Sequence, residues 1–250
     1  MQHQDGHSHL IALSNPAVRA YDPAYAYELA IIIRDGMKKM FKEGEEVFYY
    51  ITVMNEKYQM PPLPSKKGIE EEILKGMYKY KASKRKNEHN LHLMGSGSLL
   101  NEAIKAAEIL EKDYEINSDV WSVTSYKQLY DNAVETERAN RIKGTDNNSY
   151  IEKCIGRQKG IFIASSDYVK ALPLSVSKWF PGDFTALGTD GFGVSDHRRE
   201  LREHFEIDAR HIVWTALNRL HEQNKTDKQI LNKAKKKLKI ISKKESPAKI

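Results

Sequence analysis

Residues 90–114 read NLHLMGSGSLLNEAIKAAEILEKDY, and this stretch decides the fold class. The run NLHLMG predicts a strand, and SLLNEAIKAAEILEKDY predicts a helix that follows it after a glycine-rich turn. The same alternation continues with a strand over 119–125, a helix over 126–141 and a strand over 160–166. Alternating strands and helices are typical of an α/β sheet that is covered by helices on both faces.

The alternation extends toward the C-terminus. Two or three helices are expected to close the chain, and Thr226 and Gln229 predict a capping box for the last of them. The expected elements are a helix over 167–180 bent at Pro173, a short strand over 184–189, and helices over 208–223 and 226–240.

A helix and a strand precede this region. Asp22 suits an N-cap, Pro23 suits the first helical position, and Gly44 can end the helix. The run VFYYITV, residues 47–53, is β-branched and aromatic, so it predicts a strand. It is too apolar for one face to meet water, so we expect a buried strand.

A proline-rich stretch separates the two regions, because Pro61, Pro62 and Pro64 forbid regular structure there. Residues 68–80 combine helical spacing with strand-like alternation and stay ambiguous, and residues 82–90 predict a loop. The expected organisation is an incomplete N-terminal domain (1–60), a linker (61–66), a main domain (67–241) and a lysine-rich tail (242–250).

Composition limits the protein class. With 40% hydrophobic and 30% charged residues, the chain has the balance of a soluble globular protein. Its longest apolar run, LAIII, is far too short to span a bilayer, and no apolar signal core opens the chain. The single cysteine, Cys154, excludes an internal disulfide and any multi-cysteine metal cage. A reducing, cytoplasmic setting is therefore expected.

The net charge of +6 comes from one end of the chain. Residues 225–250 hold ten lysines against only Asp227 and Glu245, so the remainder is slightly acidic. A solvated lysine-rich helix with a frayed end explains this better than a polyanion site. The tail has no aromatic residues to stack on bases, so a nucleic-acid partner is not expected.

Two glycine-rich loops allow a structural and a functional interpretation. The turn MGSGS, residues 94–98, resembles phosphate-cradling turns at helix starts, but it lacks a complete dinucleotide fingerprint. A tight strand-to-helix turn is the preferred interpretation. In LGTDGFGVSD, residues 187–196, Asp190 is a possible metal ligand, and Ser195 or Asp196 can cap a helix. Because no second carboxylate cluster lies nearby in sequence, a structural loop is favoured.

The N-terminus reads MQHQDGHSH and carries His3, Asp5, His7 and His9. Imidazole and carboxylate groups suit a transition metal, but this spacing matches no standard zinc pattern. An active-site loop is the better hypothesis, since histidine exchanges protons near neutral pH. Reasoning from local sequence goes no further.

Long strings of this sequence resemble the homodimeric, decarboxylating first component of bacterial pyruvate dehydrogenase. They include QHQDGHSH, YDPAYAYELA, FYYITVMNEKYQMPPLP and LGTDGFGVSDHRRELREHF, and the resemblance covers nearly the whole chain up to about residue 240. The family uses thiamine diphosphate and Mg²⁺ to decarboxylate pyruvate, and it passes the acetyl group to the lipoyl arm of dihydrolipoyl acetyltransferase. The resemblance implies a transketolase C-terminal-like mixed sheet, preceded by a remnant of an α/β pyrimidine-binding domain.

The resemblance also implies site residues. His3 corresponds to the family's active-site histidine on the substrate side of the thiazolium ring, and His9 to a histidine of the related transketolase loop. Asp5 and His7 are expected to shape the loop, which leaves His3, His9 and Asp5 as the candidate catalytic residues.

Other family features are absent from the sequence. No GDG…N stretch for Mg²⁺ and the diphosphate is found, nor the activating glutamate, so no cofactor-binding or metal-binding residue is expected. Activity then requires a missing N-terminal part or a second subunit, and a homodimer is expected in the full enzyme. Without that polypeptide, the 47–53 strand is expected to have an unpaired edge and an exposed apolar face. The alternative function is a non-catalytic dimerisation module that binds a larger subunit.

Overall fold

The computed structural model describes residues 5–249, and its centre is a five-stranded mixed sheet. The strand order is β3-β5-β4-β6-β7, in which the last four strands are parallel and β3 lies antiparallel to β5 at one edge. The expected α/β fold with a mixed sheet is confirmed. The strands are β3 (Met77–Lys81), β4 (Leu91–Gly95), β5 (Asp119–Val123), β6 (Gly160–Ser165) and β7 (Gly182–Leu187).

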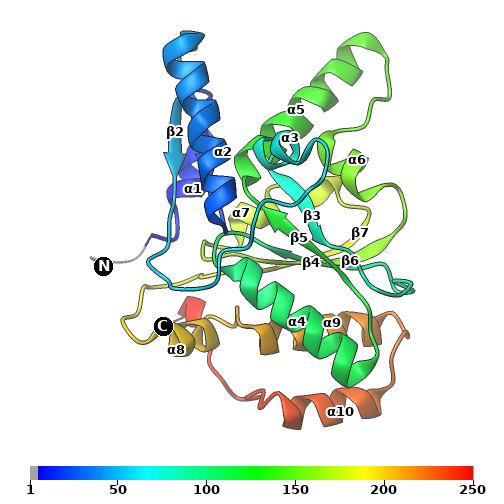
Figure 1. Cartoon of the computed structure of the whole chain (residues 1–250). Coiled ribbons are helices and arrows are strands. Elements are labelled where there is room, and N and C mark those ends of the chain that lie inside the picture. The colour runs from blue at the N-terminus through cyan, green and yellow to red at the C-terminus, as the bar shows by residue number, and fades with distance from the viewer. Residues whose placement is uncertain (1–4, 250) are drawn as a thin grey trace.

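Helices cover both faces of this sheet (Figure 1). Successive side chains of a strand point to opposite faces, so Leu91, Leu93 and Ile161 pack on one side and Met94 and Phe162 on the other. The first side is covered by α4 (Leu99–Tyr114), α9 (Ala209–Glu222) and α10 (Lys228–Lys237). The second is covered by α5 (Tyr126–Lys143), α6 (Tyr150–Ile155) and α7 (Ala171–Leu174).

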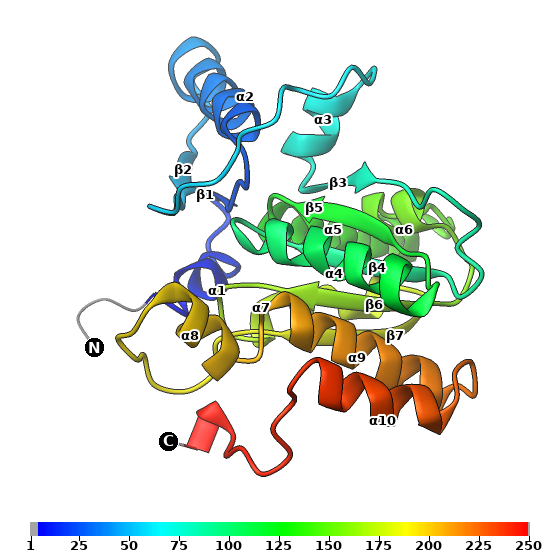
Figure 2. The same cartoon turned by 60° about the horizontal axis from the view of Figure 1, so that its bottom comes forward.

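The N-terminal part forms a smaller unit beside the carboxyl ends of the central strands (Figure 2). A parallel two-stranded sheet pairs Val18 with Phe48 and Tyr21 with Ile51. Figure 2 shows α2 beside this sheet. The elements are α1 (Ser8–Ala12), β1 (Val18–Tyr21), α2 (Ala26–Met37), a π-helical turn (Lys38–Lys42) and β2 (Phe48–Ile51).

Burial of the 47–53 strand was predicted wrongly. Within residues 5–249, β2 pairs only with β1, and Phe48 is 51% exposed and Val53 66% exposed. Phe41, in the preceding π-helical turn, is also exposed. Since β2 has one neighbour, it keeps a free edge. The exposed Phe48 and Val53 form the exposed apolar face that was expected in the absence of further polypeptide.

Two helix starts differ from their predictions. Asp22 is not the N-cap of α2: Tyr25 occupies that position, and the carboxylate of Glu28 accepts the N–H groups of Ala24 and Tyr25. In α10 the N-cap position belongs to Asp227 rather than Thr226, and no predicted capping box forms. The Thr226 hydroxyl has no hydrogen-bond partner among the described residues.

The ambiguous 68–80 stretch contains both elements, α3 (Ile69–Leu74) and then β3. The bent 167–180 helix is only α7 and a 3₁₀ turn (Ser177–Trp179). Helix α6 was not predicted, although Ser149 and Glu152 form its capping box. Before α8 (Arg198–His204), the N-cap position is His197 rather than Ser195 or Asp196.

The tail is less frayed than expected. A 3₁₀ turn (Pro247–Lys249) lies near its end, and the ammonium group of Lys244 donates to the backbone carbonyls of Glu203 and His204 at the end of α8. A lysine at a helix C-terminus satisfies carbonyl groups that have no partner within the helix.

Candidate functional site

The candidate site lies at the carboxyl ends of the central parallel strands. From β4 the chain continues to β5 on one side and, later, to β6 on the other, so the strand order reverses between β4 and β6. Ligand crevices of open α/β sheets form at such a switch point. Here Ser96 and Ser98 follow β4, and Ser166 and Asp167 follow β6. The hydroxyl groups of Ser96 and Ser166 lie 3.3 Å apart, so the two strand ends are in direct contact.

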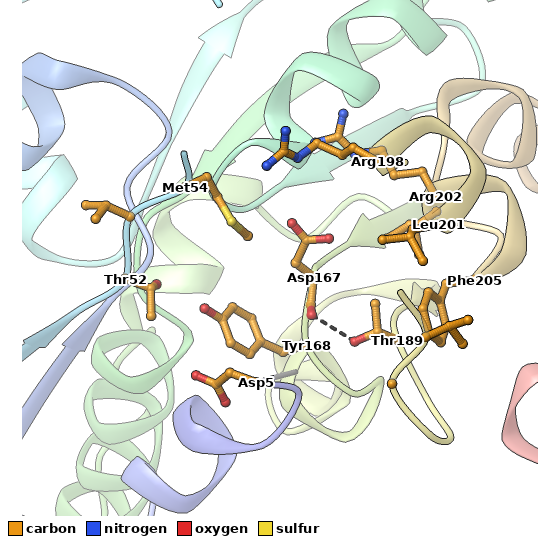
Figure 3. Close-up of a pocket in the computed structure, with 14 residues that line it drawn as sticks. Asp5, Thr52, Met54, Asp167, Tyr168, Thr189, Arg198, Leu201, Arg202 and Phe205 are labelled. Atoms are coloured by element: carbon orange, nitrogen blue, oxygen red, sulfur yellow. Dashed lines mark hydrogen bonds between the residues drawn. The ribbon is translucent and has the colours of Figure 1, made fainter. Parts of the chain in front are cut away.

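Next to this switch point is a cavity of about 430 Å³ (Figure 3). Its walls come from the segment after β2, the ends of β6 and β7, and helix α8. Apolar groups, including Met54, Leu201 and Phe205, face polar ones, so the cavity has the mixed lining of a small-molecule site. The lining residues are Asp5, Thr52, Val53, Met54, Asp167, Tyr168, Thr189, Gly193, Val194, Arg198, Leu201, Arg202, Phe205 and Ile207.

Asp167 presents its carboxylate to this cavity, as Figure 3 shows. The Ser98 hydroxyl donates to it over a long 3.4 Å, while the Thr189 hydroxyl donates to the Asp167 backbone carbonyl at 2.8 Å. Burial raises the pKa of Asp167, because the charged form is poorly solvated there. Thr189 therefore fixes the backbone of Asp167, and the Asp167 carboxylate can accept further hydrogen bonds from a ligand in the cavity.

A partly buried ion pair closes one wall of the cavity. Arg202 of α8 donates to both carboxylate oxygens of Glu56, at 2.5 and 3.1 Å, and also to Ser98 at 2.9 Å. Glu102 of α4 lies 3.5 Å from the same guanidinium and accepts the N–H of Ala209. Planar guanidinium and carboxylate groups form bidentate pairs of this kind. The segment that follows β2 is thus fastened to α4 and α8.

Of the candidate catalytic residues, His3 lies outside the described residues. Asp5 lines the cavity and caps the turn before α1, where it accepts the backbone N–H and the hydroxyl of Ser8 at 3.0 and 2.6 Å. Tyr50 of β2 donates to its second oxygen at 2.9 Å. Partial burial raises the pKa of Asp5, but the bonds from Ser8 and Tyr50 outweigh it and hold that pKa below its usual value. The carboxylate therefore orders the loop in its charged form.

His9 lies in the interior, with 5% of its surface exposed. Its Nε2 atom is 2.9 Å from the Thr52 hydroxyl, and its ring packs edge-on against Tyr168 with centroids 4.5 Å apart. Tyr50 lies against it at 5.2 Å. Burial lowers the pKa of His9 to about 4, so the imidazole is neutral at pH 7. Asp5 lies in the loop before α1 and His9 lies on α1, and His7 of that loop is exposed.

Asp22 joins this arrangement although the sequence indicated only an N-cap for it. The Thr52 hydroxyl donates to its Oδ1 at 2.8 Å, and its backbone carbonyl accepts the Gly97 N–H at 3.0 Å. Burial raises the pKa of Asp22 to about 7. The one sequence signal for it was its place in the YDPAYAYE string.

The loop after β7 gives Asp190 a structural role. Its carboxylate accepts the backbone N–H of Lys170 at 2.9 Å, with the Lys170 ammonium 3.5 Å away. Across residues 5–249, no cluster of three or more His, Cys, Asp or Glu side chains has an arrangement that suits a metal ion. The described residues therefore do not fit as a complete site for Mg²⁺ and a diphosphate.

Comparison with known proteins identifies the family. Residues 76–208, more than half of the chain, match the model of the transketolase-like C-terminal domain. The chain belongs to this family. Residues 1–61 match the middle domain of the pyruvate dehydrogenase E1 component. The two matches confirm the resemblance seen in the sequence.

Sequence relatives agree with this family assignment. The chain is 44% identical over 250 residues to the pyruvate dehydrogenase E1 component of Pseudomonas aeruginosa and 43% identical over 251 residues to that of Escherichia coli K12. These matches cover 99% of this chain but only 28% of each relative, so the chain spans little more than a quarter of their length.

Solved transketolases support the fold alone. One from Pichia stipitis has a TM-score of 0.64 at 15% identity and covers 90% of this chain and 28% of that one. A split-gene transketolase, solved as an inactive tetramer of four beta subunits, has a TM-score of 0.54 at 15% identity. The match covers 85% of this chain and 61% of that one. None of the helices in residues 5–249 has the length and apolar character needed to cross a membrane.

Proposed function

We propose that this chain works in the cytoplasm as part of a pyruvate dehydrogenase E1 component. The assembled enzyme decarboxylates pyruvate with thiamine diphosphate and Mg²⁺ and passes the acetyl group to the lipoyl arm of dihydrolipoyl acetyltransferase. The observation that carries this proposal is the 44% identity that extends over 99% of the chain, including the histidine-bearing loop. The cofactor supplies the carbanion chemistry, and the protein binds and orients it.

In this proposal the chain contributes one edge of the active site, with His3, Asp5 and His9 as its candidate catalytic residues. Asp5 orders the loop through Ser8 and Tyr50, and the neutral imidazole of His9 is able to accept a proton. The groups that hold the diphosphate and the metal lie on other polypeptide, either a further N-terminal part or a second subunit.

The N-terminal unit supports this need for further polypeptide. A two-stranded sheet is marginal by itself, and parallel sheets are normally buried on both faces. Here large apolar side chains of α2, the π-helical turn and β2 face solvent: Ile33, Met37, Phe41 and Phe48. We propose that another part of the E1 middle domain covers them, and that the whole enzyme is a homodimer.

The proposed domain organisation is 1–60, a linker over 61–66, 67–241 and a tail over 242–250. Its support is that one family match ends at residue 61 and the other begins at residue 76. Limited proteolysis tests it: a protease is expected to cut first at the linker and within residues 20–60. Equal resistance of residues 20–60 and 90–220 would contradict the exposed state of the N-terminal unit.

The decisive experiment is complementation. The chain is co-expressed with the remaining N-terminal portion of the Pseudomonas aeruginosa relative, and pyruvate-dependent reduction of a dye is measured with thiamine diphosphate and Mg²⁺. Activity is expected only from the pair, and a thiamine diphosphate titration of the chain alone is expected to show no saturable binding. Activity of the pair that never exceeds that of either part would refute the proposal.

Single substitutions in the complemented enzyme test the loop. His3→Ala is expected to lower kcat at least tenfold, since a proton-handling side chain contributes about 10²-fold or more. His7→Ala is the matched control on the same loop, because His7 is exposed, and full activity is expected.

The exposed apolar surface also favours the second candidate function, a non-catalytic module that binds a larger subunit. Co-purification with a complete E1 component, without any gain in turnover for either protein, would support that alternative.

A further inference from the structure

A chain of three side chains connects α1 to the ends of the two strands of the N-terminal unit. His9 Nε2 lies 2.9 Å from Thr52 Oγ1, and the Thr52 hydroxyl donates to Asp22 Oδ1 at 2.8 Å. The residues come from three segments: His9 from α1, Thr52 from the residue after β2, and Asp22 from the residue after β1. None of the three is adjacent to another in sequence, so only the tertiary structure forms this connection.

The count of protons decides the direction of the hydrogen bonds. A threonine hydroxyl has one proton to donate and two lone pairs to accept. When Asp22 is ionised, Asp22 Oδ1 and the backbone carbonyl of Tyr21, at 3.3 Å, can only accept the Thr52 proton. Whichever of them takes the proton, Thr52 can only accept from His9. The bond from His9 therefore requires a proton on Nε2, which leaves Nδ1 of the neutral ring unprotonated.

The surroundings preserve this arrangement. Asp22 and His9 are 6% and 5% exposed, so both ends of the chain are shielded from bulk water, while the half-buried Thr52 between them lines the cavity. The rings of Tyr168 and Tyr50 flank the imidazole, and Gly97 N–H fixes the backbone of Asp22 against the start of α4. A hydrogen bond to one ring nitrogen sets which tautomer a histidine adopts.

We propose that Asp22 and Thr52 are positioning residues that orient the His9 imidazole and hold it in the Nε2-protonated tautomer, with Nδ1 as the free proton acceptor. The catalytic meaning of this device rests on the proposed function, in which His9 belongs to the active-site loop. The tautomer itself is a property of the chain alone.

The test is a long-range ¹H–¹⁵N NMR spectrum of the full chain labelled at histidine nitrogens, recorded at pH 8, where Asp22 is mostly ionised. The His9→Gln variant identifies the His9 signals by their disappearance. The expected result is one signal set with a protonated, pyrrole-type Nε2 and an unprotonated, pyridine-type Nδ1. A protonated Nδ1, or averaged shifts of two equally populated tautomers, would overturn the proposal without any variant being needed.

Substitutions then assign the roles of the two residues. Thr52→Val removes the acceptor at nearly constant volume and is expected to give averaged tautomer shifts. Asp22→Ala leaves only the longer contact of the Thr52 hydroxyl with the Tyr21 carbonyl, so it is expected to move the shifts part of the way toward the average. Thr52→Ser keeps the hydroxyl and is expected to retain the parent pattern. Thr189→Val is the matched control, since Thr189 lines the same cavity but bonds to the Asp167 carbonyl. Parent shifts in both Thr52→Val and Asp22→Ala would refute the positioning role.

Turnover separates this inference from the proposed function. In the complemented enzyme, His9→Gln measures whether the imidazole contributes to the reaction, and Thr52→Val with Thr52→Ser rescue measures whether its orientation does. The parent tautomer together with full activity of His9→Gln would leave the positioning device in place and remove its catalytic role. An Nδ1-protonated His9 in an active enzyme would refute the positioning role of Asp22 and Thr52 and would leave the proposed function unaffected.

Discussion

A methyl group on Gly97 would lie 2.7 Å from both carboxylate oxygens of Asp22. Gly97 also has a φ of +50° and donates its N–H to the Asp22 carbonyl. The glycine-rich turn after β4 therefore binds the residue after β1, Asp22, at the start of α4. The space beside this turn is occupied by a carboxylate of the N-terminal unit, which supports the structural interpretation of the MGSGS stretch.

Gly97→Ala is expected to destabilise the protein by about 3 kcal/mol, because it adds a steric overlap with Asp22 to the 1–2 kcal/mol of a left-handed conformation. Urea unfolding measures the change in the free energy of unfolding. Gly144→Ala is the control: its φ is +64°, but no described atom lies within 4 Å of the added methyl group. The control is expected to lose only about 1–2 kcal/mol. Equal losses would show that the contact with Asp22 is unimportant.

Arg202→Met is expected to cost about 1.5–3 kcal/mol, because it removes the bidentate partner of the half-buried Glu56 and the guanidinium beside Glu102, which then keeps Lys105 at 2.7 Å. The side chain of Arg202 is 10% exposed, whereas that of Arg198, one turn earlier on α8, is 42% exposed. Arg198→Met is thus a matched control with an expected loss below about 1 kcal/mol. Thermal unfolding monitored by circular dichroism compares the two, and similar melting temperatures would contradict the importance of the buried pair.

The raised pKa of Asp22 predicts that Asp22→Asn changes the free energy of unfolding by an amount that depends on pH. Burial raises the pKa of Asp22 from 3.8 to about 7, so the folded state holds a proton that the unfolded state releases. The contribution of Asp22 to stability therefore falls as the pH rises from about 4 to 7. Relative to the parent, Asp22→Asn should gain up to about 4 kcal/mol between pH 4 and pH 8. Urea unfolding of both proteins across this range gives the difference, and a constant difference would disprove the shifted pKa.

The lowered pKa of His92 predicts that its effect on stability depends on pH with the opposite sign. Its Nδ1 accepts the indole N–H of Trp121 at 3.1 Å, its Nε2 lies 3.0 Å from Asn90 Oδ1, and burial lowers its pKa from 6.5 to about 4. As the pH decreases from about 6.5 to 4, His92 becomes protonated in the unfolded chain but stays neutral in the folded one, so stability falls. His92→Gln should remove up to about 3 kcal/mol of that loss. Urea unfolding followed by circular dichroism provides the measurement, and parallel pH profiles of the two proteins would contradict it.

Part of the site was accessible to sequence reasoning, and part was not. The loop with Asp5 and His9 was recognised from its residue types and its resemblance to a family. Asp22 was interpreted only as an N-cap, because a buried carboxylate that faces a distant hydroxyl has no local pattern. Arg202, Glu56 and Asp167 were not recognised at all, since each looks like an ordinary charged residue of a helix or loop.

The sequence by itself determined the alternation of strands and helices, because strand and helix periodicity and turn chemistry are local properties of the chain. It indicated the family as well, since long ordered strings such as YDPAYAYELA resemble those of the family. Only the tertiary structure decided which groups meet at the carboxyl ends of the strands. The contact of Asp22 with Gly97 joins the two units, and that of Thr52 with His9 joins two segments of the N-terminal unit. Both link residues far apart in sequence, so their burial and proton sharing exist only in the folded chain.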